Sequence, residues 1–208
     1  MDTNTFRHLS YGVYIISSWD GERPTGCTAN SAMQITSQPA TIALSINHDN
    51  FTNGCIEKSG KFAINILAED SDSALIGRFG FQSGRDVDKF AGLKHQEFAG
   101  LPVLTDTCGY IVCKVINKME TATHTVFLGE VMDAEVARGG EAMTYAYYHR
   151  VVKGKAPKNA PTYLPPVEEE AKTVKKLVCS VCGYEYEGDA LPAGFKCPIC
   201  GVGAEKFK

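Results

Sequence analysis

The C-terminal end contains the stretch Cys179-Ser180-Val181-Cys182-Gly183-Tyr184, which decides how this part of the chain folds. After one loop follows a second stretch with the same cysteine spacing, Cys197-Pro198-Ile199-Cys200-Gly201. Two C-x-x-C pairs around one loop are typical of four thiolates on a tetrahedral metal ion. The glycine after each pair permits a tight turn that directs backbone N–H groups at the sulfurs. We therefore predict one metal ion with four ligands: Cys179, Cys182, Cys197 and Cys200.

The spacing of these cysteines does not choose the metal. Four thiolates hold iron and zinc equally well, and a zinc ribbon would be structural and often a docking surface. The acidic residues Glu185, Glu187 and Asp189 lie beside the site in the sequence. Their negative charge argues against docking to nucleic acid.

Length and composition indicate a globular protein with one ordinary domain and a small one. The chain has 208 residues, 44% of them hydrophobic and 22% charged, and a net charge of −3. This charge gives no basic field for nucleic acid or an anionic membrane. Residues 1–8 contain no apolar signal segment, and no apolar run is long enough to span a bilayer. The remaining cysteines are scattered, and reduced thiols fit a cytoplasmic location: Cys27, Cys55, Cys108 and Cys113.

The first three quarters of the chain read as a mainly β domain. Runs of β-branched and aromatic residues predict strands at residues 11–18, 41–47, 61–67, 109–116, 125–132 and 143–148. One short helix is predicted between Asn50 and Gly60, capped by Asn50 or Thr52, and another over about residues 71–78. Because strands do not alternate with long helices, we expect a barrel with helical insertions. The chain has no G-x-G-x-x-G or P-loop motif, so a Rossmann or P-loop nucleotide site is not expected.

Composition divides the chain into three parts. We predict a barrel domain at residues 1–152, a linker at 153–176 and the metal module at 177–208. The linker is rich in proline and charge, which favours an extended conformation. It is long enough to let the metal module move between two surfaces.

Small polar residues cluster at three places in the barrel domain. Residues 28–31 could present backbone N–H groups and short side chains to a planar ligand. Ser45 and Asn47 end the next predicted strand. Asn50 and Thr52 start a helix whose N-terminus could bind a phosphate. Ordinary polar turns are the alternative interpretation of each cluster.

A series of stretches in fixed order carries a family resemblance: residues 12–16, 28–31, 62–67, 88–90, 124–131, 144–149 and 154–163. Over about residues 5–163 the chain resembles the flavin reductase family, in the branch whose members carry an appended rubredoxin. Residues 176–208 resemble a short rubredoxin with a trimmed loop. The resemblance implies an FMN-binding split β-barrel with short helices and a small rubredoxin-like domain whose four cysteines bind metal.

The resemblance also implies roles for particular residues. FMN would be held at its ring by four residues: Thr28, Ala29, Asn30 and Ser31. Toward the ribityl phosphate it would be held by Ser45, Asn47, Asn50 and Thr52. Arg85 is a further phosphate candidate, with a surface ion pair as the alternative. His124 matches a histidine near the flavin and nicotinamide that would position them, and the alternative is a structural histidine that starts a strand.

These expectations combine into one function. NAD(P)H would reduce FMN in the barrel, and electrons would pass singly to one iron ion on the four cysteines and then to an acceptor protein. The resemblance implies flavodiiron oxygen or nitric oxide reductases as acceptors, and a homodimer as the assembly. Attachment to a flavin domain favours iron over zinc. The alternative is a flavin-binding adaptor or free-flavin reductase with a structural zinc ribbon.

Overall fold

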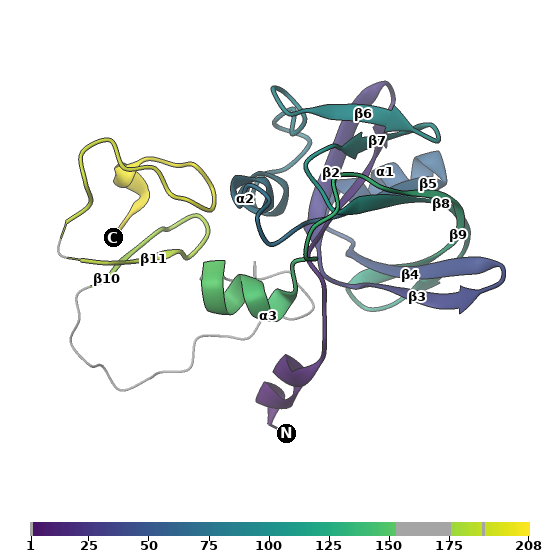
Figure 1. The fold of residues 1–208 in the computed structure, drawn as a ribbon, viewed down its shortest axis with the longest axis horizontal. Helices are drawn as coiled ribbons and strands as arrows, with labels where there is room; N and C mark the ends of the chain where they lie inside the picture. The colour runs from purple at the N-terminus through teal and green to yellow at the C-terminus, as the bar shows by residue number, and fades with distance from the viewer. Residues whose placement is uncertain (1, 153–175, 189) are drawn as a thin grey trace.

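The structure is a computed structural model, and it describes residues 2–152, 176–188 and 190–208 (Figure 1). A curled sheet forms the larger part. The C-terminal module lies beside α2 (Ala74–Phe81) and α3 (Tyr145–Tyr147). The predicted linker lies outside the described residues except for Lys176, so the domain boundaries stay a prediction.

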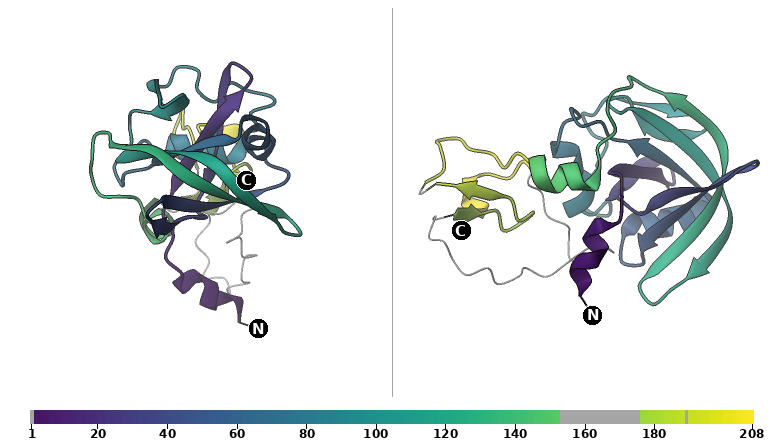
Figure 2. Two further views of the ribbon diagram at one scale, coloured as in Figure 1. Left: turned by 90° about the vertical axis from the view of Figure 1, so that its right-hand side faces the viewer. Right: turned by 60° about the horizontal axis from the view of Figure 1, so that its bottom comes forward.

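One antiparallel sheet of seven strands makes the barrel. Its strands are β1 (Tyr14–Asp20), β2 (Arg23–Ala29), β3 (Ala32–Ser37), β4 (Ala40–Asn47), β5 (Lys61–Ile66), β8 (Gly109–Glu120) and β9 (His124–Val136). Their order across the sheet is β2-β1-β5-β8-β9-β4-β3. The register between β8 and β9 shifts at Val112/Cys113 and again at Val115/Asn117. Such irregularities increase local twist and bending, which fits the strong curl that Figure 2 shows. The expected mainly β barrel is confirmed.

Several strands were not predicted, and one predicted strand is wrong. β2 (RPTGCTA) shows no hydrophobic alternation, whereas β3 (AMQITS) has Met33 and Ile35 alternating with polar residues but was not predicted. The hairpin of β6 (His95–Phe98) and β7 (Leu101–Leu104) has strands of only four residues. Residues 143–148 do not form a strand: α3 continues there into a π-helical turn, η2 (Tyr148–Val152). The Thr144 side chain accepts a hydrogen bond from the Tyr147 N–H, and this N-cap outweighs the β propensity of the tyrosines.

The helices are short, and none in the described part of the chain is long and apolar enough to cross a membrane. α1 (Phe51–Ser59) has Asn50 as its N-cap and Gly60 in the left-handed conformation (φ 66°) as its C-cap, as predicted. α2 begins three residues later than expected. The Asp72 carboxylate accepts from the Ala74 N–H at 2.9 Å and so holds a turn before the helix.

Two apolar clusters join the helices to the sheet. Ile16, Phe62 and Phe127 are fully buried within the barrel. Phe79 of α2 meets Phe90 edge-on, with 5.2 Å between ring centroids, in a second cluster that includes Ile15. Burial of Phe79 fixes one face of α2 against the barrel and leaves another face directed outward.

The C-terminal module is small, and its buried cluster consists mainly of its cysteines rather than of a large hydrophobic core. Its secondary structure consists of β10 (Lys176–Val178), β11 (Glu185–Glu187) and the 3-10 turn η3 (Ala204–Lys206). The isolated bridges Cys179–Phe207 and Lys196–Gly203 close it. A domain this small usually needs a metal or disulfides to hold its fold.

Candidate functional site

A pocket of about 290 Å³ opens where α1 begins and α2 ends. It is lined by the start of α1, the end of α2 and the loop that follows: Asp49, Asn50, Phe51, Phe79, Gly80, Phe81, Gln82, Ser83, Gly84 and Lys89. Backbone N–H groups at a helix N-terminus, three aromatic rings and a lysine meet there. This combination suits an anionic ligand with an aromatic part.

The predicted phosphate end lies at this pocket. The Asn50 side-chain oxygen accepts from the Thr52 N–H at 3.0 Å, so Asn50 caps the helix while it lines the pocket. Thr52 is buried behind it. The Arg85 guanidinium lies 5.5 Å from the ring centroid of Phe51 and forms no ion pair with the described residues. Arg85 directly follows the lining residues Ser83 and Gly84 but does not itself line the pocket, and its surface-pair alternative finds no partner among the described residues.

The predicted ring loop lies beside the C-terminal half of α2. The Thr28 hydroxyl donates to the Ile76 carbonyl at 3.1 Å, and a Cβ at Gly80 would lie 3.4 Å from the same hydroxyl. The Ser31 hydroxyl donates to the Asn30 side chain at 2.9 Å, and the Ser45 N–H donates to the Ser31 carbonyl at 2.9 Å. The fold thus brings residues 28–31 beside Ser45 and α2. Ala29 ends β2 between Thr28 and Asn30.

His124 and Asn47 pair across β4 and β9, and neither lines the pocket as described. The Asn47 side chain accepts from the Asp49 N–H at 2.8 Å and so shapes the approach to α1. Burial, followed by the nearby His48, lowers the pKa of His124, which favours its neutral form. His124 Nε2 is buried with no hydrogen-bond partner among the described residues, while Nδ1 lies 2.8 Å from the Thr123 hydroxyl. An orphaned ring nitrogen of this kind fits a position that a ligand completes.

Lys89 lines the pocket, although the sequence alone predicted no binding role for it. Its ammonium donates to the Gly26 carbonyl at 2.9 Å and the Phe79 carbonyl at 3.0 Å, and the side chain is only 3% exposed. Burial lowers the pKa of Lys89, and the nearby Cys27 opposes that effect. A lysine just before a buried phenylalanine, after a short helix, was the available sequence signal. Its charge would favour an anionic ligand.

A second buried polar atom without a hydrogen-bond partner among the described residues lies next to Gly84 in the pocket wall. The Thr25 hydroxyl is buried with no hydrogen-bond partner in the described part of the chain. A Cβ at Gly84 would overlap that hydroxyl and contact the Phe51 ring at 2.9 Å. Only glycine fits at this point of the pocket wall. The unpartnered Thr25 hydroxyl, next to the lining residue Gly84, fits a site that is completed by a polar ligand such as a flavin.

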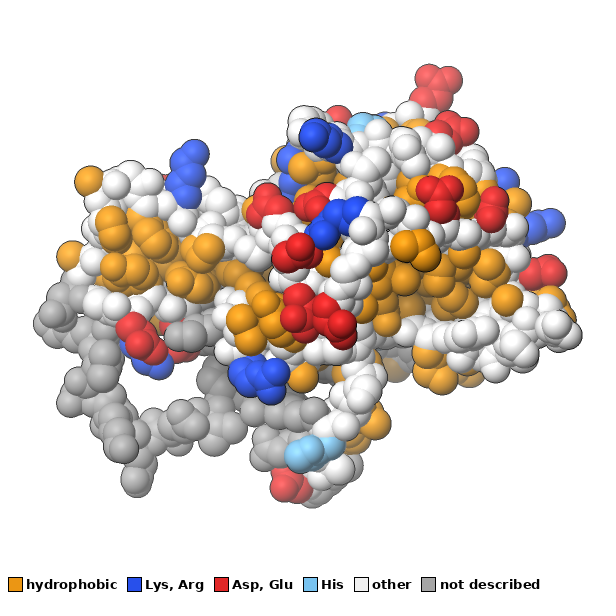
Figure 3. Space-filling model, viewed as in Figure 1, with side chains coloured by type: hydrophobic (Ala, Val, Ile, Leu, Met, Phe, Trp, Pro, Cys, Tyr) orange, Lys and Arg blue, Asp and Glu red, His pale blue; other side chains and the backbone are white. Residues whose placement is uncertain are grey.

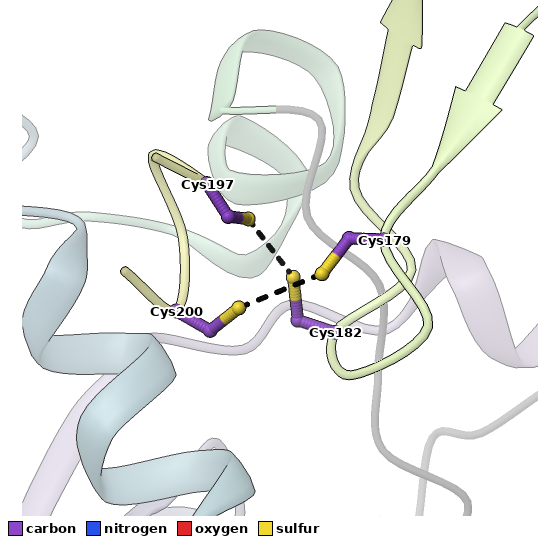
Figure 4. A group of neighbouring side chains, drawn as sticks. All are labelled: Cys179, Cys182, Cys197 and Cys200. Atoms are coloured by element: carbon purple, nitrogen blue, oxygen red, sulfur yellow. Dashed lines mark hydrogen bonds between the residues drawn. The ribbon is translucent and has the colours of Figure 1, made fainter. Parts of the chain in front are cut away.

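The four cysteines of the C-terminal module converge as predicted (Figure 4). Their sulfur atoms all lie within 4.8 Å of one another, with 3.6 Å between Cys179 and Cys200 and 3.4 Å between Cys182 and Cys197. A tetrahedral site with metal–sulfur bonds of about 2.3 Å has sulfur–sulfur edges of about 3.8 Å. The donor set and its size therefore fit one metal ion with four thiolates.

Both turns at this centre use glycine as predicted. Gly183 and Gly201 have φ values of 74° and 73°. Their N–H groups donate to the Cys179 carbonyl at 2.9 Å and the Cys197 carbonyl at 2.8 Å. A side chain at either position would be strained, so the glycines fix the two loops that present the sulfurs.

The thiols differ in acidity according to their surroundings. Burial raises the pKa of Cys200 to about 12 and also raises that of Cys182. At Cys179 burial acts in the same direction, but backbone N–H groups of Cys182 and Val181 outweigh it and lower the pKa. Cys182 and Cys200 are therefore protonated at neutral pH without a cation, and metal binding must release their protons.

Apolar groups surround the centre on two sides. Phe207 meets Tyr184 and Phe195 edge-on, at 6.4 and 5.4 Å between ring centroids. From the barrel, Phe81 and Val152 pack against the same cysteine cluster. An apolar shell of this kind controls solvent access and dielectric at a metal, and hence its reduction potential.

A split barrel with this pocket and a four-cysteine module define a flavin reductase-type oxidoreductase with a rubredoxin-like metal domain. Residues 6–156 match the family described as "Flavin reductase like domain", and residues 178–208 match "Rubrerythrin, rubredoxin-like domain". The chain belongs to the flavin reductase family and carries a C-terminal rubredoxin-like domain.

Known proteins are similar to the whole of this chain or to part of it. High molecular weight rubredoxin of Moorella thermoacetica is 42% identical, over 100% of this chain and 99% of its own. Ferric-chelate reductase (NAD(P)H) of Archaeoglobus fulgidus is 38% identical, over 78% of this chain and 98% of its own. Among solved structures, the flavin reductase PheA2 superposes with a TM-score of 0.58 at 31% identity, over 67% of this chain and 90% of its own.

Proposed function

We propose that this protein carries electrons from NAD(P)H through FMN to a rubredoxin-type iron centre and on to an acceptor protein. The observation that carries the proposal is that the pocket and the four-cysteine centre lie against one helix. Phe81 of α2 lines the pocket and also packs against the cysteine cluster. A relative named for NAD(P)H-dependent ferric-chelate reduction and another named as a rubredoxin support the two halves.

The chain's own residues would hold the flavin at both ends. The α1 N-terminus at Asn50, the Lys89 ammonium and Arg85 would bind the phosphate. Residues 28–31, with Ser45 beside them, would contact the ring. A bound flavin would accept two electrons as a hydride and release them one at a time, and ferric iron accepts only one electron at a time. Neutral His124 would position ring and nicotinamide rather than move a proton.

The four thiolates would hold iron as the one-electron site. Each hydride from NAD(P)H would supply the two electrons that reduce two Fe(III) to two Fe(II), with release of one proton. Since each chain has one such site, it must hand an electron to its acceptor between the two reductions. Flavodiiron oxygen or nitric oxide reductases are the acceptor class we propose, in a cytoplasmic setting.

A homodimer is the assembly we propose. Large apolar side chains are exposed on three strands of the barrel: Met33, Ile35, Ile116, Met119, Met132 and Val136. Hydrophobic surface on the barrel is also visible in Figure 3. Exposed apolar side chains in such number are typical of surfaces that bind another protein, and a second copy would cover them.

The test is anaerobic rapid mixing of the full-length, flavin-loaded protein with NADH or NADPH while flavin and iron absorbance are recorded. We expect the flavin bands to bleach first and the iron bands afterwards, and metal analysis to find one iron per chain. In Cys182→Ser, flavin reduction should persist while iron absorbance is absent. A yellow protein with one zinc per chain and normal flavin reduction would overturn the conduit in favour of a structural zinc ribbon.

A further inference from the structure

Gly77 lies in the middle of α2 at the point where the metal module touches the barrel. A Cβ at this position would overlap the carbonyl oxygen of Ile199 and lie 2.6 Å from the Cα of Cys200. Real Cβ atoms do not come this close to backbone. Any residue but glycine would therefore push the Cys197–Cys200 loop away from the helix.

Other contacts fix the same orientation. The Ser73 hydroxyl donates to the Pro198 carbonyl at 2.9 Å, one helical turn before Gly77. Ile199 is only 1% exposed, because Phe81 from the barrel packs against the cysteine cluster to which it belongs. The contact is thus apolar at its centre and hydrogen-bonded at its edge, as specific interfaces are.

The C-terminal half of α2 also lies at the flavin pocket. Phe79, Gly80 and Phe81 line that pocket. The Ile76 carbonyl accepts the hydrogen bond from Thr28 in the predicted ring loop. Because Gly77 directly follows Ile76, one hydrogen bond, one peptide unit and one van der Waals contact connect the ring loop to a metal ligand. In Figure 4 a helix of the barrel lies beside the cysteines.

We propose that Gly77 is a positioning residue for electron transfer from the pocket to the cysteine centre within one chain. The inference rests on the proposed function and adds its geometry. Glycine at position 77 permits the closest approach of the ligand loop to α2, and tunnelling falls steeply as that separation grows. The transfer moves one electron from the reduced flavin to Fe(III), which becomes Fe(II), with no atom transferred between the sites.

The test compares Gly77→Leu with Gly54→Leu in the full-length, iron- and flavin-loaded protein. Gly54 is a matched control because it is also inside a helix, and a Cβ there meets nothing within 4 Å. Rapid mixing with NAD(P)H gives the flavin and iron phases separately. Hydrogen–deuterium exchange of α2 and of residues 196–203 reports the contact independently of activity. Gly77→Ala repeats the test with a smaller side chain if Gly77→Leu does not fold.

We expect Gly77→Leu to keep the wild-type rate of flavin reduction, to lose the fast iron phase, and to exchange faster at both segments. Gly54→Leu should behave as wild type in all three measurements. An iron phase in Gly77→Leu as fast as in Gly54→Leu would overturn the inference. So would a wild-type iron phase whose rate rises in proportion to protein concentration, since transfer would then occur between molecules. If wild-type iron is not reduced at all, the proposed function fails first, and the exchange data still report whether the contact exists.

Discussion

The Thr28 hydroxyl and the Ile76 carbonyl are joined by a hydrogen bond of 3.1 Å between β2 and α2. The two residues are 48 positions apart in the sequence, so this bond depends on the tertiary fold. It ties the loop proposed to hold the flavin ring to the helix that carries the metal module. The same side chain therefore links binding at one site to the position of the other.

Replacing Thr28 by Val should weaken this link with little change in shape, because both side chains are β-branched. Loss of one partly buried hydrogen bond is expected to lower the free energy of unfolding by about 1 kcal/mol. Flavin affinity, measured by fluorescence titration, should also fall. The control is Thr105→Val. In the wild type the Thr105 hydroxyl donates a hydrogen bond of 3.3 Å to the Lys94 carbonyl at an exposed site. Equal flavin affinity in the two variants would contradict a role for Thr28 at the ring loop.

Lys89→Met should separate the role of charge from that of packing in the pocket. Two of the three ammonium N–H groups donate to backbone carbonyls, and the third remains for a ligand. Loss of those bonds should destabilise the protein by about 1–3 kcal/mol. Loss of the charge should weaken FMN more than riboflavin, which lacks the phosphate. Lys114→Met, at an exposed position of β8, should change neither affinity. Equal weakening of FMN and riboflavin would mean that Lys89 does not act on the phosphate.

Local sequence signals predicted those parts of the site whose geometry is set within a few residues. The four cysteines and the glycines that follow them are brought together by short turns. Asn50 and Gly60 cap α1 as expected because capping depends on neighbouring backbone groups. For the same reason the strands with hydrophobic alternation, such as β5, were predicted well.

Parts that depend on distant partners could not be predicted from the sequence. β2 contains Arg23, Pro24 and Gly26, and pairing with β1 rather than propensity makes it a strand. Lys89 acquires its role from the Gly26 carbonyl on another element. Nothing local to Gly77 indicates that Ile199 will lie against it, since the two are joined only by packing of the module on α2.

His124 predicts a pH dependence of stability. Burial, with His48 nearby, holds its pKa below the ordinary value of 6.5. As pH falls below about 6.5, the unfolded chain takes up a proton at this residue that the folded protein resists. The free energy of unfolding should therefore decrease as pH falls, until the pKa of folded His124 is passed. Other titrating groups nearby are His48 and Glu120, which lie 3.0 Å apart, and Lys118.

The measurement is urea unfolding of wild type and His124→Gln at a series of pH values from 7.5 downward. The glutamine variant should lose the part of the slope that His124 contributes, so the two curves should converge as pH falls. Parallel curves across the whole range would show that burial of His124 does not resist protonation. Flavin reduction by NAD(P)H should be slower in His124→Gln if the residue also positions the nicotinamide.

Removal of the hydroxyl group from Tyr148 and from Tyr110 is expected to change the free energy of unfolding differently. The Tyr148 hydroxyl is buried without a hydrogen-bond partner among residues that the structure describes. Burial raises the pKa of Tyr148, and the thiols of Cys182, Cys197 and Cys200 contribute in the same direction. By contrast, the Tyr110 hydroxyl donates to Glu135 at 2.7 Å and accepts from Gln96 at 2.9 Å. Both side chains are almost fully buried, so packing is comparable.

In the metal-free protein, Tyr148→Phe should leave the free energy of unfolding unchanged or raise it by up to about 1 kcal/mol, because no hydrogen bond is lost and a buried orphan is removed. Tyr110→Phe should lower it by about 1–2 kcal/mol, because Glu135 and Gln96 both lose their partner. Urea unfolding of the two variants in the presence of a chelator measures the difference. A Tyr148→Phe variant as unstable as Tyr110→Phe would mean that the Tyr148 hydroxyl has a partner in solution, and the thiols beside it would be the first groups to examine.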